Sequence, residues 1–136
     1  MTQKEVDQLA FEIIGCCIEV HKELGPGLLE SIYEEALFFE LTSKGYSVER
    51  QKEIEVIYKN NRLDKKHKLD LIVENSVIVE LKSVKEFHPL YTAQTLSQMK
   101  LVKTPKGLLV NFNVTNIVKE GYKSFVNNYY NILPSN

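Results

Sequence analysis

The sequence predicts an α/β (α+β) fold in which a mixed sheet is flanked by helices. The N-terminal part carries apolar residues at helical spacing, and the next part alternates between apolar and polar residues as half-buried strands do. Between residues 77 and 112, two apolar runs enclose a helical segment, which is typical of parallel strands joined by a crossover helix. These patterns predict the order helix, helix, strand, strand, strand, helix, strand. The tail after residue 115 could be a strand, a helix, or one followed by the other.

Two amphipathic helices are predicted first. The stripe of residues 4–24 consists of Val6, Leu9, Ala10, Ile13, Cys17, Val20 and Leu24. The stripe of the second helix, about residues 28–44, consists of Leu29, Tyr33, Ala36, Leu37 and Leu41. The segment "GPG" at 25–27 separates the two helices, and Gly45 is a plausible C-terminal cap of the second.

A hairpin is predicted next, because residues 48–58 alternate and a second strand-like segment returns at 62–73. The two asparagines at 60–61 suit a tight turn, since Asn tolerates left-handed dihedrals. A two-residue turn there predicts favourable cross-strand pairs between Glu53 and Lys68 and between Glu55 and Lys66.

A second turn decides where the acidic residues fall. If residues 74–76 form a three-residue turn, Asp70 lies opposite Glu80, and alternation puts Lys82 on the same face as Glu80. A two-residue turn would instead place Asp70 opposite Leu81. The three-residue turn is therefore a testable prediction of the hairpin register. A helix at about 90–102 and a strand in "KGLLVNF" follow.

Length and composition fit one domain over residues 1–136. The net charge of -1 argues mildly against tight nonspecific binding of DNA, although basic residues cluster at 65–68 and at Lys82 and Lys85. The adjacent Cys16 and Cys17 have no other cysteine with which to pair, which favours a reducing compartment. With no apolar signal segment at the N-terminus, we expect a cytoplasmic protein.

Convergence of Asp70, Glu80 and Lys82 would create a site for chemistry. Two carboxylates at one point repel each other unless a cation lies between them, and Mg²⁺ or Mn²⁺ prefers oxygen ligands. A lysine beside them could orient a water or stabilise charge on a phosphate. A buried ion pair between the lysine and a carboxylate explains the same residues without any catalysis.

Three further residues each have two interpretations. His21 falls on the inward stripe of the first helix, where a histidine is more often a satisfied core residue than a ligand. Glu30 lies in the first turn of the second helix, where the helix dipole favours a carboxylate, but it could also reach over the sheet. Gln94 could hold a phosphate or a water, or could simply be a surface residue.

Several motifs together resemble a known family. The segment "VHKELGPGLLESIYEEAL" contains Gly27, Glu30 and Tyr33 in the spacing G-x-x-E-x-x-Y, and "LDLIV", "VIVELKSV", "AQTL" and "KGLLVNFN" follow. Over about residues 11–126 the chain resembles the GxxExxY protein family, a branch of the PD-(D/E)XK nuclease superfamily. The resemblance implies a restriction endonuclease-like fold with an αβββαβ core.

The resemblance also implies roles for individual residues. Asp70 and Glu80 would be ligands of Mg²⁺ or Mn²⁺, with the Leu81 carbonyl as a third, and Lys82 would be the catalytic lysine. Glu30 would match the acidic residue often supplied by the first core helix. His21 would match a metal-binding histidine of RecB-type exonucleases, and Gln94 the glutamine of the Q-x-x-x-Y motif of RecB-like nucleases.

Three positions depart from the pattern. Gln98 replaces the tyrosine of Q-x-x-x-Y, Tyr91 stands where relatives are expected to have histidine, and Lys68 stands where arginine is expected. The first two changes alter the helix that would contact the substrate and leave the proposed metal ligands intact.

The predicted function is that of a metal-dependent nuclease that hydrolyses phosphodiester bonds in DNA or RNA. The alternative is a catalytically inactive module that keeps the fold to bind nucleic acid or a protein partner, in one form as a homodimer. The alternative predicts an ion pair that joins Lys82 directly to Asp70 or Glu80.

Overall fold

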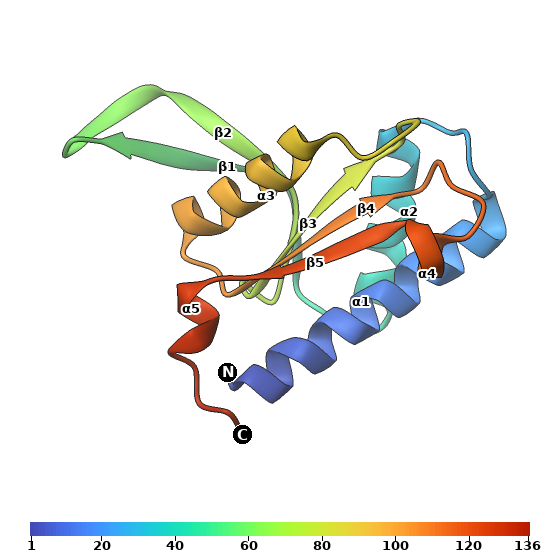
Figure 1. Cartoon of the computed structure of the whole chain (residues 1–136), viewed down its shortest axis with the longest axis horizontal. Helices are drawn as coiled ribbons and strands as arrows, with labels where there is room; N and C mark the ends of the chain where they lie inside the picture. The colour runs from blue at the N-terminus through green and yellow to red at the C-terminus, as the bar shows by residue number, and fades with distance from the viewer.

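The computed structural model describes residues 1–136, which form a five-stranded sheet with helices on both faces (Figure 1). The strands are ordered β1-β2-β3-β4-β5 across the sheet. The elements are α1 (Gln3–Leu24), α2 (Glu30–Ser43), β1 (Val48–Tyr58), β2 (Asn61–Val73), β3 (Val77–Lys82), α3 (Pro89–Val102), β4 (Lys106–Asn111), α4 (Ile117–Glu120), β5 (Tyr122–Val126) and α5 (Asn128–Asn131). The predicted fold class and order of elements are confirmed.

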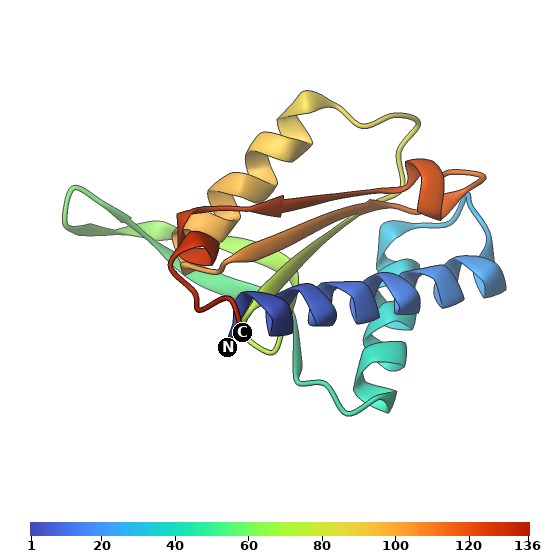
Figure 2. The same ribbon diagram turned by 60° about the horizontal axis from the view of Figure 1, so that its bottom comes forward.

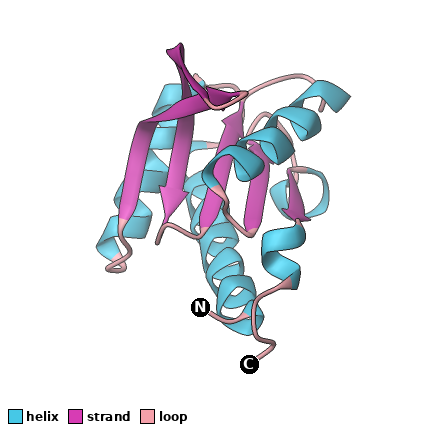
Figure 3. Cartoon of the chain, turned by 90° about the vertical axis from the view of Figure 1, so that its left-hand side faces the viewer, coloured by secondary structure: helices cyan, strands magenta, loops and turns pink.

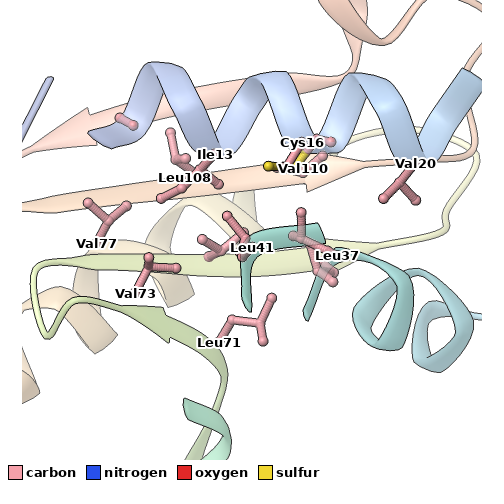
Figure 4. Close-up of a cluster of buried hydrophobic side chains, with 14 of the residues drawn as sticks. Ile13, Cys16, Val20, Leu37, Leu41, Leu71, Val73, Val77, Leu108 and Val110 are labelled. Atoms are coloured by element: carbon pink, nitrogen blue, oxygen red, sulfur yellow. The ribbon is translucent and has the colours of Figure 1, made fainter. Parts of the chain in front are cut away.

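The helices cover the two faces of the sheet unequally. Helices α1 and α2 lie on one face and α3 lies on the other (Figure 2), and the side view in Figure 3 shows the same layers. The α1–α2 face holds the larger core, and Figure 4 shows its aliphatic side chains meeting between the sheet and the two helices. The smaller core under α3 consists of Ile54, Leu69, Ile72, Ile78 and Met99.

Helix α1 follows its sequence signals closely. Thr2 caps its N-terminus, with Glu5 completing a reciprocal capping box. Cys16 and Cys17 both lie in this helix as buried free thiols. Neither this helix, the longest of the chain, nor any other is long and apolar enough to cross a membrane.

Strands β3 and β4 are parallel, with Val77 opposite Lys106 and Lys82 opposite Asn111. Helix α3 connects them, so the strand–helix–strand unit is confirmed. Every other pair of neighbouring strands is antiparallel. The ambiguous tail contains both kinds of structure, because the short helix α4 is followed by β5, which pairs along β4.

The turn of the first hairpin differs from the prediction by one residue. Lys59 and Asn60, with φ of 48° and 66°, form the turn, and Tyr58 pairs with Asn61. The predicted turn at Asn60 and Asn61 is therefore wrong. Lys59 adopts the left-handed dihedrals that asparagine favours. The composition of the segment does not indicate that a lysine would take this position in the turn.

The predicted pairs of that hairpin are nevertheless confirmed, with Glu53 opposite Lys68 and Glu55 opposite Lys66. A register shift next to Glu55 adds residues on β2 and compensates for the misplaced turn. The ion pairs join diagonal rather than directly opposed residues: Lys66 Nζ lies 3.7 Å from Glu53, and Arg62 Nε lies 3.4 Å from Glu55. These pairs are exposed and contribute little stability.

Gly121 permits the close approach of α4 to the end of β4. Its amide donates to Ile117 O (2.9 Å), and its carbonyl accepts from Asn111 N (2.7 Å). A Cβ at Gly121 would lie 2.6 Å from Ile117 Cγ1 and 2.7 Å from the Ile117 main chain. We expect Gly121→Ala to lower the free energy of unfolding in urea by about 1–3 kcal/mol.

The matched control is Gly15→Ala. Gly15 lies inside α1, and a Cβ there meets nothing within 4 Å. Alanine is a better helix former than glycine, so this variant should be more stable by about 0.5–1 kcal/mol. Equal stability of the two variants would contradict the assignment of Gly121 as a site of steric contact.

Candidate metal and active site

The hairpin of β2 and β3 has the predicted three-residue turn. Val73 pairs with Val77, and the ladder continues to Leu71 opposite Val79. Within the turn, Glu74 and Asn75 both have a φ of 52°. The register is confirmed, and by the same count the next pair of opposed residues is Asp70 and Glu80.

Beyond Leu71 and Val79 the ladder ends, and two carboxylates take over its hydrogen bonds. Asp70 N donates to Glu80 Oε1 (3.1 Å), and Leu81 N donates to Asp70 Oδ2 (2.9 Å). Each acidic side chain thereby satisfies an amide that the partner strand no longer pairs. The separation of the strands is what brings the two carboxylates together.

The Glu80 carboxyl group is strongly perturbed. Only 7% of the residue is exposed. Burial, and next the negative charge of Asp70, raise the pKa of Glu80 to about 8, against the opposing effects of the Asp70 amide and the charge of Lys82. Two neighbouring acidic groups with too little compensating charge form a site that a divalent cation would stabilise.

The ammonium of Lys82 does not neutralise this pair. Its Nζ lies 4.5 Å from the centroid of the Tyr91 ring, on α3. No carboxylate oxygen lies within 4.0 Å of it, as the ion pairs of the chain show. The direct ion pair that the non-catalytic alternative predicts is therefore not formed.

Glu30 reaches the end of β3 from the start of α2. Its Oε1 accepts from Ser83 N (3.3 Å), and Ser83 Oγ donates to Leu28 O (2.6 Å). These contacts hold the segment before α2 against the residue that follows β3. The acidic residue of the G-x-x-E-x-x-Y motif is thereby placed near Asp70, and both line the same cleft.

Tyr33 anchors that segment from within the core. Its side chain is fully buried and stacks on Phe112 at 4.4 Å between ring centroids. Its hydroxyl donates to Gly25 O (2.6 Å) and accepts from Leu28 N (3.1 Å). The tyrosine therefore fixes the glycine-rich loop that presents Glu30.

A cleft of about 610 Å³ opens between α2 and the point where β2 and β3 separate. Its lining residues are Leu28, Leu29, Glu30, Ser31, Glu34, Gln51, Asp70, Leu81 and Ser83. Glu80 and Lys82 are not among them: Glu80 is buried beside Asp70, and Lys82 lies toward α3. The cleft thus gives access to the carboxylate pair through Asp70.

The Leu81 carbonyl also points toward this gap. Phe112 N donates to Lys82 O (3.0 Å), so Lys82 directs its carbonyl at β4. Consecutive residues of a strand direct their backbone groups to opposite sides. Leu81, whose amide donates to Asp70, therefore directs its carbonyl toward β2, where the strands separate.

Three residues of the site were not singled out by the sequence. Glu34 is 7% exposed and accepts from Arg50 Nε (3.2 Å) and from the Gln51 amide. Gln51 also donates to Asp70 Oδ1 (3.4 Å) and has a φ of 47°. A signal was present, because the register with Glu53 opposite Lys68 also places Gln51 opposite Asp70.

His21 and Gln94 do not join the carboxylates. His21 Nε2 lies 2.8 Å from Val114 O, and the ring is not part of the cleft. Gln94 is exposed on α3. Gln98, which replaces the expected tyrosine, is 4% exposed, and its amide lies 3.0 Å from His67 Nε2.

The donor set fits Mg²⁺ or Mn²⁺ better than zinc. No three His, Cys, Asp or Glu side chains are grouped as metal ligands. Zinc usually takes three or four nitrogen, sulfur or carboxylate ligands from the protein. Magnesium is commonly held by one or two carboxylates and keeps several waters, a requirement that Asp70, Glu80 and a carbonyl can meet.

Comparison with known proteins agrees with this geometry. A family model described as the PD-(D/E)XK nuclease superfamily matches residues 7–125. Searches of curated proteins and of solved structures found no match. Because the model spans most of the chain, including both carboxylates and the lysine, the chain belongs to the PD-(D/E)XK nuclease superfamily.

Proposed function

We propose that the protein is a metal-dependent nuclease that hydrolyses phosphodiester bonds in DNA or RNA. The observation that carries the proposal is the pairing of Asp70 with Glu80 where β2 and β3 separate, next to a lysine that is not joined to either. A purely structural role would favour neutralising the pair with that lysine. Two adjacent acidic side chains without a lysine partner support a site for a cation.

Asp70, Glu80 and the Leu81 carbonyl would hold Mg²⁺ or Mn²⁺. When bound, such an ion polarises a phosphoryl oxygen and makes a bound water more acidic. Lys82 would stabilise negative charge that develops on the phosphate. Glu30 would orient the attacking water from the cleft, and Gln94, exposed on α3, would contact a neighbouring phosphate.

We also assign the chain to the GxxExxY branch of the superfamily. Gly27 has a φ of 95°, which favours glycine. Glu30 contacts the end of β3, and the Tyr33 hydroxyl forms hydrogen bonds with the loop between α1 and α2. Each of the three residues of the motif therefore has a physical role in presenting the acidic side chain of α2.

The nuclease proposal is tested by incubating the protein with single- and double-stranded DNA and RNA in the presence of Mn²⁺. We expect cleavage of at least one substrate, and a rate about 10²–10³ times lower for Lys82→Ala and for Asp70→Ala. Lys119→Ala, an exposed lysine of α4, serves as the charge-matched control and should cleave normally. If no substrate is cleaved, or if the two site variants are fully active, the proposal is wrong.

The alternative is an inactive module that binds nucleic acid or a protein partner. The burial of Gln98 against His67 favours it, because that side chain is not presented to a substrate. Calorimetric titration with Mn²⁺ separates the two. Binding that Glu80→Ala abolishes counts against the inactive module, whereas nucleic-acid binding without any Mn²⁺ affinity supports it.

A further inference from the structure

We propose that Tyr91 is a positioning residue that holds the Lys82 ammonium away from Asp70 and Glu80, so that the carboxylate pair stays open to a cation. The inference rests on the proposed metal site. It assigns a role to a residue of α3 that lies outside the cleft. Tyr91 contributes its aromatic face rather than a ligand atom.

The geometry is that of a cation over an aromatic face. Lys82 is the last residue of β3, and Tyr91 lies in the first turn of α3. Their contact, 4.5 Å from Nζ to the ring centroid, is within the range in which the electron-rich face of an aromatic ring attracts an ammonium. The contact is partly shielded, since both residues are neither fully buried nor fully exposed.

The ring of Tyr91 is itself held in place. Its amide donates to His88 O (2.9 Å), and its carbonyl accepts from Thr95 Oγ1 (3.0 Å), so the backbone beneath the ring is fixed within the helix. The His88 ring meets the tyrosine ring edge-on, with centroids 6.1 Å apart. A ring fixed in this way provides a defined position for the ammonium.

The competing position for the ammonium is the carboxylate pair. Glu80 lies two residues before Lys82 on the same strand, so the two side chains leave the same face. The positive charge of Lys82 acts on Glu80 from its present position, and it is the weakest of the influences on the pKa of that carboxyl group. An ammonium in direct contact would neutralise the pair and compete with a divalent cation.

Loss of the aromatic face should therefore weaken metal binding. When a binding-competent state is only partly populated, the apparent affinity falls by that fraction. The affinity for Mn²⁺ can fall by no more than the free energy of the lost cation–π contact. The usual range of that free energy corresponds to a dissociation constant for Mn²⁺ that rises by about twofold to thirtyfold.

Calorimetric titration of the full chain with Mn²⁺ tests this expectation. Tyr91→Leu should raise the dissociation constant within that range, whereas Tyr91→Phe, which keeps the ring, should bind as the wild type does. Adding Lys82→Met to Tyr91→Leu should restore the affinity, because no ammonium is left to compete. Equal affinities of wild type and a folded Tyr91→Leu, or no restoration in the double variant, would overturn the inference.

A second measurement needs neither metal nor activity. In the metal-free protein, the side-chain methylene protons of Lys82 next to the ring face should show an upfield ring-current shift in the NMR spectrum. The shift should persist in Tyr91→Phe and be lost in Tyr91→Leu. Unshifted protons in the wild type would overturn the inference even if Mn²⁺ binds. If the protons are shifted but the wild type binds no Mn²⁺, the contact between Lys82 and Tyr91 exists. Its role in keeping a metal position open would then be overturned, and so would the metal site of the proposed function.

Discussion

Glu80→Gln is expected to make the metal-free protein more stable at high pH than the wild type. The folded-state pKa of Glu80, about 8, lies above its ordinary value of 4.5, so between these values the folded protein keeps a proton that the unfolded chain has released. The stabilisation from this proton is complete below the lower value and is lost as the pH rises through the upper one. Glutamine keeps an oxygen for the Asp70 amide and carries no charge.

Urea unfolding between pH 5 and pH 9 in the presence of a chelator measures this effect. We expect the wild type to lose about 1–3 kcal/mol of unfolding free energy across this interval relative to Glu80→Gln. Asp70→Asn should reduce the dependence, because the neighbouring negative charge contributes to the raised pKa of Glu80. If the unfolding free energies of the wild type and of Glu80→Gln changed with pH in the same way, the raised pKa of Glu80 would be contradicted.

Divalent cations extend the same experiment. With Mn²⁺ present, we expect the wild type to regain stability at pH 8–9, since a cation that binds only the folded state shifts the unfolding equilibrium. Glu80→Gln should gain much less. An equal gain in both proteins would place the bound Mn²⁺ elsewhere in the molecule.

Tyr33→Ala is expected to be the most destabilising single substitution in the candidate site region. The side chain is fully buried and stacked on Phe112, so its removal leaves a large cavity and should cost about 3–5 kcal/mol of unfolding free energy. Tyr33→Phe keeps the stack and removes only the hydroxyl. It should cost about 1–3 kcal/mol, because Gly25 O and Leu28 N lose their partner.

Urea unfolding of both variants measures these costs, with Tyr58→Ala as the control. Tyr58 is 57% exposed near the tip of the first hairpin, so its removal should change stability by no more than about 0.5 kcal/mol. A Tyr33→Phe variant as stable as the wild type would show that the hydroxyl does not hold the loop. Cleavage by Tyr33→Phe should then also be unaffected, since Glu30 would keep its place without it.

Much of the fold could be predicted because local patterns and burial agree along most of the chain. The capping box of Thr2 and Glu5, the alternation of β1 and the apolar run of β3 each indicate one type of element. The tail could not be assigned, because α4 spans only residues Ile117–Glu120 and β5 only Tyr122–Val126. Such short elements depend on neighbours, here on the ladder with β4 and on the contact at Gly121.

The candidate site was predictable to the extent that it depends on register. A strand with one buried face has its pairing strongly specified, so the turn at residues 74–76 was enough to bring Asp70 opposite Glu80. The interaction of Gln51 with Glu34 could not be predicted, because it joins a kink in β1 to a helix that no register relates to it.

The amino-acid sequence alone determined which residues face each other between β2 and β3 and along most of the first hairpin, because the alternation of apolar and polar residues specifies the register. It did not determine the pairs next to the first turn, where a register shift intervenes. Only the tertiary structure decided where the ammonium group of Lys82 lies. Lys82 could reach either the carboxylates or α3, and the placement of Tyr91 by the crossover helix directs it to the ring. The burial that raises the pKa of Glu80 likewise requires the packed sheet and its helices, since desolvation is a property of the whole fold.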